Sequence, residues 1–133
     1  MPKILIVEDE ANNVEIFTRL LTRSGFQCEV ATNKEAAVAK ARDEMPELIL
    51  MDIRMPLTDG GEESQHAGLE ATREIKSLPE TSGIPVIALT GDAMRDFRTR
   101  MAEAGFSDYV EKPVTDYAAF VGTIRKHLDS APA

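Results

Sequence analysis

Short apolar runs and longer amphipathic segments alternate along the chain. Five runs have the length of β-strands, at residues 3–7, 26–31, 48–51, 85–89 and 108–110. The run at 48–51 is apolar throughout, which is typical of a central parallel strand covered on both faces. The run at 26–31 alternates between apolar and polar residues and predicts a strand nearer the sheet edge.

Each run is followed by apolar residues at helical spacing. Gly25 should end the first helix, Asn33 and Pro46 should bound the second, the third covers 69–78, and Asp92 can cap the fourth. Five repeats of strand and helix predict an α/β fold, a doubly wound parallel sheet with helices on both faces. The stripes expected to be buried are Val14, Phe17, Leu20 and Leu21; Ala37 and Ala41; Leu69, Thr72 and Ile75; Met94, Phe97, Met101 and Ala104; and Tyr117, Phe120, Val121, Ile124 and Leu128.

The stretch between the third strand and the third helix is polar and rich in glycine. We expect an extended loop at 57–68, since strand-to-helix connections usually have about 2–6 residues. His66, Glu62 and Glu63 could form a second metal site within it, but a flexible acidic loop is the favoured interpretation.

Composition narrows the class of protein. The 133 residues suffice for one domain, 1–133, and 43% hydrophobic with 29% charged residues is typical of soluble globular proteins. No apolar run approaches the roughly 20 residues of a membrane span, and the amino terminus lacks a signal-peptide pattern. The lone Cys28 fits a reducing cytoplasm. A net charge of −8 argues against nucleic-acid binding.

Reactive side chains stand at the carboxyl ends of four predicted strands. Glu8 and Asp9 follow the first strand, Asp52 the third, Thr90 the fourth and Lys112 the fifth. In an open parallel sheet these ends meet at one edge, where ligands bind. Carboxylates gathered there repel one another unless a cation lies among them. The grouping therefore predicts a metal-assisted site for phosphoryl transfer.

Four segments carry a family resemblance. They are Ile-Leu-Ile-Val-Glu-Asp-Glu at 4–10, Leu-Met-Asp-Ile-Arg-Met-Pro at 50–56, Ile-Ala-Leu-Thr at 87–90 and Tyr-Val-Glu-Lys-Pro at 109–113. Over nearly its whole length the chain resembles a bacterial two-component response-regulator receiver domain. The resemblance implies a flavodoxin-like five-stranded sheet with strand order 2-1-3-4-5. Because the chain stops soon after its last helix pattern, it looks like a free-standing receiver without an output domain.

The resemblance implies that Asp52 accepts a phosphoryl group from a phosphohistidine on a histidine kinase or histidine phosphotransfer protein. Mg2+ would be bound by Asp9, Asp52 and the backbone carbonyl of Arg54, with Glu8 acting through a water molecule. Such a protein catalyses its own phosphorylation and slow autodephosphorylation without being a multiple-turnover enzyme.

The resemblance also implies a conformational switch. Lys112 and Thr90 would contact phosphoryl oxygens, and movement of Thr90 would allow Tyr109 to turn inward. The surface of the fourth helix, fifth strand and fifth helix would then change for a downstream regulatory protein. The bond between Lys112 and Pro113 is the family's candidate for a cis peptide.

Some positions depart from the family pattern or flank the site. Gly61–Gly68 reads as an insertion beside the active site, and we hypothesise that it tunes kinase recognition or access of water to the phosphoaspartate. Arg54 and Asp92 could form a salt bridge over the entry and slow hydrolysis, while Gly91 keeps the site open. His127 is expected to be exposed and receives no role.

Two other functions compete with this interpretation. A constitutive protein-binding module on the same fold would typically lack the acceptor, an acidic residue or the lysine, and all are present here. A phosphohydrolase with an aspartate nucleophile would carry Asp-x-Asp at its first strand, whereas this chain has Glu8-Asp9-Glu10 there. The sequence therefore favours the phosphorylatable receiver.

Overall fold

The computed structural model describes residues 2–58, 60–64, 66–91 and 102–130. The strands of its main sheet lie in the order β2-β1-β3-β6-β7, and each neighbouring pair is parallel. Counted within this sheet alone the order is 2-1-3-4-5, so the predicted doubly wound fold is confirmed. The strands are β1 (Lys3–Val7), β2 (Gln27–Ala31), β3 (Leu48–Asp52), β6 (Val86–Thr90) and β7 (Asp108–Glu111).

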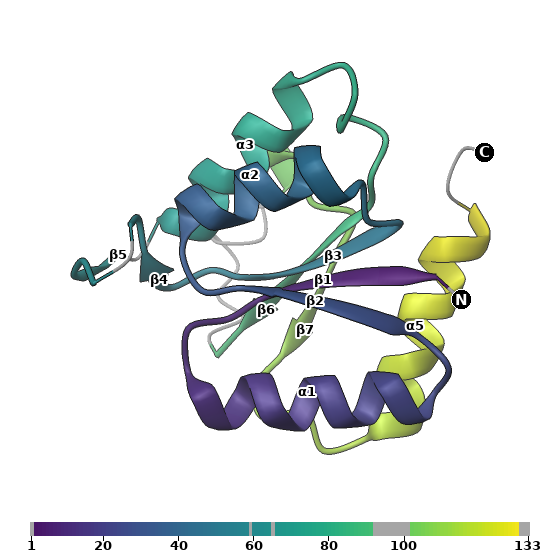
Figure 1. Ribbon diagram of the computed structural model, residues 1–133. Coiled ribbons are helices and arrows are strands. Elements are labelled where there is room, and N and C mark those ends of the chain that lie inside the picture. The colour runs from purple at the N-terminus through teal and green to yellow at the C-terminus, as the bar shows by residue number, and fades with distance from the viewer. Residues whose placement is uncertain (1, 59, 65, 92–101, 131–133) are drawn as a thin grey trace.

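Helices cover both faces of the sheet. In Figure 1, α1 (Ala11–Arg23) and α5 (Tyr117–Ser130) lie on one face, and α2 (Lys34–Glu44) and α3 (Ala67–Ser77) lie on the other. Because successive strand residues point to opposite faces, the core has two layers. Leu5, Val7, Ile49 and Met51 pack with α2 and α3 residues, whereas Ile4, Ile6, Leu48 and Leu50 pack with α1 and α5 residues. Burying a side chain of this size contributes roughly 1.5–3 kcal/mol.

The predicted ends of the first two helices are confirmed. Gly25 follows α1 with a φ of 95°, a conformation that glycine adopts without strain. The Asn33 side chain accepts a hydrogen bond of 2.8 Å from the Ala36 amide at the start of α2. That helix ends at Glu44, two residues before Pro46.

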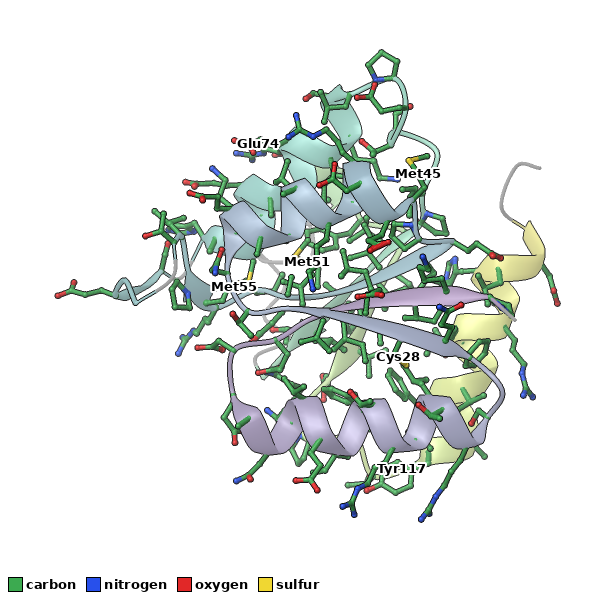
Figure 2. The ribbon with its side chains drawn as sticks, viewed as in Figure 1. Cys28, Met45, Met51, Met55, Glu74 and Tyr117 are labelled. Atoms are coloured by element: carbon green, nitrogen blue, oxygen red, sulfur yellow. The ribbon has the colours of Figure 1, made fainter. Side chains whose placement is uncertain are left out.

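Among the described residues of the predicted buried stripes, one is exposed. Phe120, Val121 and Ile124 are buried as expected, but Tyr117 is 49% exposed, and Figure 2 shows it on the outside of the molecule. Tyr117 is the first residue of α5, and helical side chains tilt towards the amino terminus. Its ring therefore has no preceding turn to pack against.

The fourth predicted helix falls largely on residues outside the described part of the chain, including Asp92, Met94, Phe97 and Met101. Ala104, the last residue of that stripe, is described and is buried.

The expected loop at 57–68 is partly structured. β4 (Met55–Pro56) pairs antiparallel with β5 (Glu63–Ser64), so the polar stretch forms a small hairpin. Helix α3 begins at Ala67 rather than at residue 69, and Gly68 belongs to this helix. The loop prediction was therefore too long, because Ala67 and Gly68 are buried in the first turn of α3.

Within the described residues, no helix combines the length and apolar character that crossing a membrane requires.

Candidate functional site

The strand ends deliver the predicted residues to one edge of the sheet. Asp52 is the last residue of β3 and pairs with Leu89 in β6. Thr90 is the next residue of β6 after Leu89. The Thr90 carbonyl accepts a hydrogen bond of 2.8 Å from the Lys112 amide, which fixes the end of β7 beside β6. Glu8 follows β1, and its amide donates to Ala31 of β2. The parallel register thus determines which residues meet.

Three carboxylates come together at this edge. Glu8, Asp9 and Asp52 each place one carboxylate oxygen within 4.8 Å of the others. Glu8 and Asp52 are buried, being 1% and 4% exposed, and Asp9 is the most exposed of the three. Within the described residues this is the one cluster of metal-binding side chains. The Glu63 side chain is outside the described part of the chain, so the possible second site at Glu62, Glu63 and His66 stays a hypothesis.

Lys112 places a positive charge between two of these carboxylates. Its Nζ lies 3.1 Å from Oε2 of Glu8 and 3.2 Å from Oδ1 of Asp52. Glu8 was expected to act on a metal through water and Lys112 on a phosphoryl oxygen. In this structure the two side chains bind each other, and both expected roles stay predictions.

The electrostatics of the cluster favour a bound cation. Burial and, after it, the charge of Glu8 raise the pKa of the Asp52 carboxyl to about 7, and Lys112 only partly opposes them. Burial lowers the pKa of the Lys112 ammonium, but the charges of Asp52 and Glu8 outweigh it, so this pKa lies above its ordinary value. The single ammonium of Lys112 therefore does not fully offset the cost of ionising the buried Asp52 carboxyl beside Glu8.

The donor set suits a hard divalent ion. Three carboxylates are the oxygen ligands that Mg2+ prefers. The Arg54 amide donates to Oδ1 of Asp52 over 3.3 Å, so the backbone turns tightly just after Asp52 and keeps residue 54 at the site. The Arg54 side chain is exposed. Residues present at this edge therefore fit Mg2+ chemically.

The remaining predicted residues lie around this edge. Thr90 is 4% exposed and ends β6, and Gly91 follows it in an open position. Tyr109 is half-buried and packs against the cluster of Ile53, Leu69, Ala88 and Ala104. The peptide bond between Lys112 and Pro113 is cis. Asp92 is outside the described residues, so its expected bridge to Arg54 stays a prediction.

Two features were missed by reasoning from sequence. His127 was expected to be exposed, but its side chain is only 15% exposed and its Nε2 lies 2.9 Å from Oδ2 of Asp108. The available signal was its position three residues after Ile124 on the buried stripe of α5. The second feature is the close contact of Gly68 with the backbone of Asp52, which no sequence pattern indicated.

Comparison with known proteins decides the family. A family model described as the response regulator receiver domain matches residues 4–121. The chain belongs to the response regulator receiver domains.

Individual receivers resemble the whole chain. The polar-differentiation response regulator DivK of Brucella anthropi is 36% identical over 132 residues, which are 98% of this chain and 100% of that protein. The receiver domain of the sensor histidine kinase PA1611 from Pseudomonas aeruginosa is 30% identical, with a TM-score of 0.82 and coverage of 97% and 98%. That crystal structure has a magnesium ion coordinated in its active-site cleft. The chemotaxis protein CheY4 of Vibrio cholerae, 21% identical with a TM-score of 0.84 over 95% of this chain and 98% of that one, shares the fold.

Proposed function

We propose that this receiver domain accepts a phosphoryl group on Asp52 in a reaction that needs Mg2+. The observation that carries the proposal is the shared rim of Glu8, Asp9 and Asp52, with the Lys112 ammonium among them. An acceptor carboxylate, oxygen ligands for a divalent cation and a second positive charge are the parts that phosphoryl transfer requires.

The reaction joins an oxygen of the Asp52 carboxylate to phosphorus. A phosphohistidine donor loses its bond between phosphorus and nitrogen, and its imidazole regains a proton. Asp52 must be ionised to attack, and its pKa of about 7 in the metal-free protein leaves a large fraction protonated at neutral pH. A cation beside the carboxylate lowers this pKa and so increases the reactive fraction.

Each neighbouring residue has a separate task in this proposal. Asp9, Asp52 and the Arg54 carbonyl would hold Mg2+ directly, and Glu8 would act on it through a water molecule. When bound, the ion would supply positive charge to the phosphoryl oxygens. Lys112 exchanges its carboxylate partners for a phosphoryl oxygen.

The position of Thr90 in the sheet supports a proposed switch. Thr90 ends β6 beside β7, the strand that carries Tyr109. We propose that its hydroxyl donates to a phosphoryl oxygen and that the half-buried Tyr109 ring then turns further inward. The surface made by the fourth predicted helix, β7 and α5 changes with it. Phosphorylation can shift the populations of the two conformations only as far as their contacts with the phosphoryl group differ.

The partners follow from the same chemistry. The donor is a histidine kinase or a histidine phosphotransfer protein, and the switched surface binds a downstream regulatory protein in the cytoplasm. The resemblance to DivK and to the receiver of a sensor histidine kinase supports a place in two-component signalling. A constitutive binding module remains the alternative function, and the complete acidic site speaks against it.

The test is incubation of the purified protein with acetyl phosphate, with and without Mg2+, followed by intact mass measurement. We expect one added phosphoryl group only with Mg2+, no addition to Asp52→Asn, and full addition to Asp43→Asn, which removes an exposed carboxylate from α2. Absence of any addition to the parent would favour the binding module. Sustained turnover of acetyl phosphate without a stable product would favour a hydrolase.

A further inference from the structure

Helix α3 approaches the backbone of the proposed acceptor through Gly68. A Cβ atom at this position would overlap the carbonyl oxygen of Asp52 and lie 2.7 Å from Cα of Ile53. Both atoms belong to the backbone, so they cannot rotate away as a flexible side chain could. No other residue type would therefore fit here without moving α3 or the end of β3.

The other glycines do not share this environment. Five of them would place a Cβ with nothing within 4 Å, namely Gly25, Gly60, Gly83, Gly91 and Gly122. At Gly105 the nearest atoms belong to the flexible Lys76 side chain, and at Gly61 the nearest contact is 3.2 Å. Glycine is required at 68 because a Cβ atom would clash with the backbone of Asp52 and Ile53, at the end of the strand that carries the proposed acceptor.

Hydrogen bonds hold the residue after the acceptor from two sides. The Ile53 carbonyl accepts a bond of 3.0 Å from the Gly68 amide, and the Ile53 amide donates a bond of 3.2 Å to Leu89 in β6. The peptide groups on either side of Ile53 are therefore anchored to α3 and to the sheet. These are the groups that orient the Asp52 side chain and the Arg54 carbonyl.

We infer that Gly68 is a positioning residue for the metal and phosphoryl site. Its lack of a side chain lets α3 bind the Asp52–Arg54 backbone closely, and this contact sets the angle between the Asp52 carboxylate and the Arg54 carbonyl. The inference rests on the proposed function, because it assigns these two groups to one Mg2+ ion.

The same contact links the β4–β5 hairpin to the acceptor. β4 begins at Met55, directly after Arg54, and β5 ends at Ser64, four residues before Gly68. Both ends of the hairpin thus lead to the backbone of Asp52 and its neighbours.

The test compares Gly68→Ala with the parent by calorimetric titration of Mg2+ without a phosphodonor. We expect a 10- to 100-fold weaker Mg2+ affinity, as for other groups that orient metal ligands, and slower phosphorylation by acetyl phosphate. The matched control is Ile75→Val or Ile75→Ala, whichever has the urea midpoint of Gly68→Ala. Ile75 is buried in the same helix away from Asp52, and its variants should keep the parent's Mg2+ affinity.

Equal Mg2+ affinity in the parent and a folded Gly68→Ala would overturn the inference, and so would an equal loss in the Ile75 control. If Gly68→Ala does not fold, amide hydrogen exchange of the parent decides. Mg2+ should then slow exchange at the Gly68 amide more than at Ile124 in α5, and equal slowing would contradict the inference. A parent that takes up no Mg2+ would refute the proposed function itself, together with this dependent role.

Discussion

The Lys112 ammonium lies 3.1 Å from Oε2 of Glu8, although 104 residues separate the two in the chain. The same ammonium contacts Asp52 at 3.2 Å. Without metal, one lysine therefore partly neutralises two buried carboxylates that would otherwise repel each other. In the proposed reaction, a divalent cation would neutralise these carboxylates and weaken the electrostatic hold on Lys112, whose side chain could then bind a phosphoryl oxygen.

The stability of the metal-free protein should fall as pH rises through the range in which Asp52 ionises. Its folded-state pKa of about 7 lies above the ordinary 3.8, so the folded protein binds this proton more tightly than the unfolded chain. The contribution is fully present below pH 3.8 and is lost by about pH 7. Between about pH 5 and about pH 8 we expect a loss on the order of 2–3 kcal/mol from this group.

Urea unfolding of the parent and of Asp52→Asn at several pH values measures this effect. The free energy of unfolding of Asp52→Asn should exceed that of the parent by most at the highest pH values. Mg2+ should reduce the pH dependence of the parent's stability. Glu8→Gln provides a second check, because removing that charge should lower the pKa of Asp52 in a carboxyl NMR titration. A difference between parent and Asp52→Asn that does not change with pH would contradict this account.

Arg54→Ala should shorten the lifetime of the phosphorylated form. The substitution leaves the proposed carbonyl ligand in place and removes only the exposed guanidinium, which we expect to shield the phosphoryl group together with Asp92. The measurement is the decay of the phosphorylated species after removal of acetyl phosphate. Arg42→Ala, an exposed arginine on α2, should decay at the parent's rate. An unchanged lifetime in Arg54→Ala would refute the shielding role.

Shortening the hairpin should separate partner recognition from chemistry. Replacing residues 58–65 by a tight turn keeps Gly68 and its contact with Asp52, which a deletion of 61–68 would destroy. We expect phosphorylation by acetyl phosphate to stay near the parent's rate and transfer from the cognate kinase to slow. Glu62→Gln, which keeps the length, distinguishes charge from shape. Unchanged transfer from the kinase would show that the hairpin has no part in recognition.

The contact between His127 and Asp108 should stabilise the packing of α5 against β7. Their side chains are 15% and 33% exposed, and a partly buried hydrogen bond contributes about 1 kcal/mol. Urea unfolding of His127→Ala, Asp108→Ala and the double variant gives the coupling free energy, which we expect to be about 1 kcal/mol. Asp129→Ala, at an exposed position of the same helix, should have little effect. Purely additive effects would show that the two side chains are not coupled.

Local pattern sufficed to predict the parallel sheet and the residues at its edge. A strand such as Leu48–Asp52 is apolar enough to require cover on both faces, and repeated strand–helix units then permit few topologies. Asp52, Thr90 and Lys112 could be assigned to one edge because carboxyl ends of parallel strands coincide there, whatever the details of packing.

Contacts between distant segments were decided only by the tertiary structure. The pairing of Lys112 with Glu8 was not predicted, because burial and charge depend on which side chains folding brings together. The position of Gly68 against Asp52 and the burial of His127 beside Asp108 likewise depend on how helices sit on the sheet. The spacing of residues along a chain predicts which face of a helix or strand a side chain occupies. Which side chain of another element it contacts is decided only when the elements pack together.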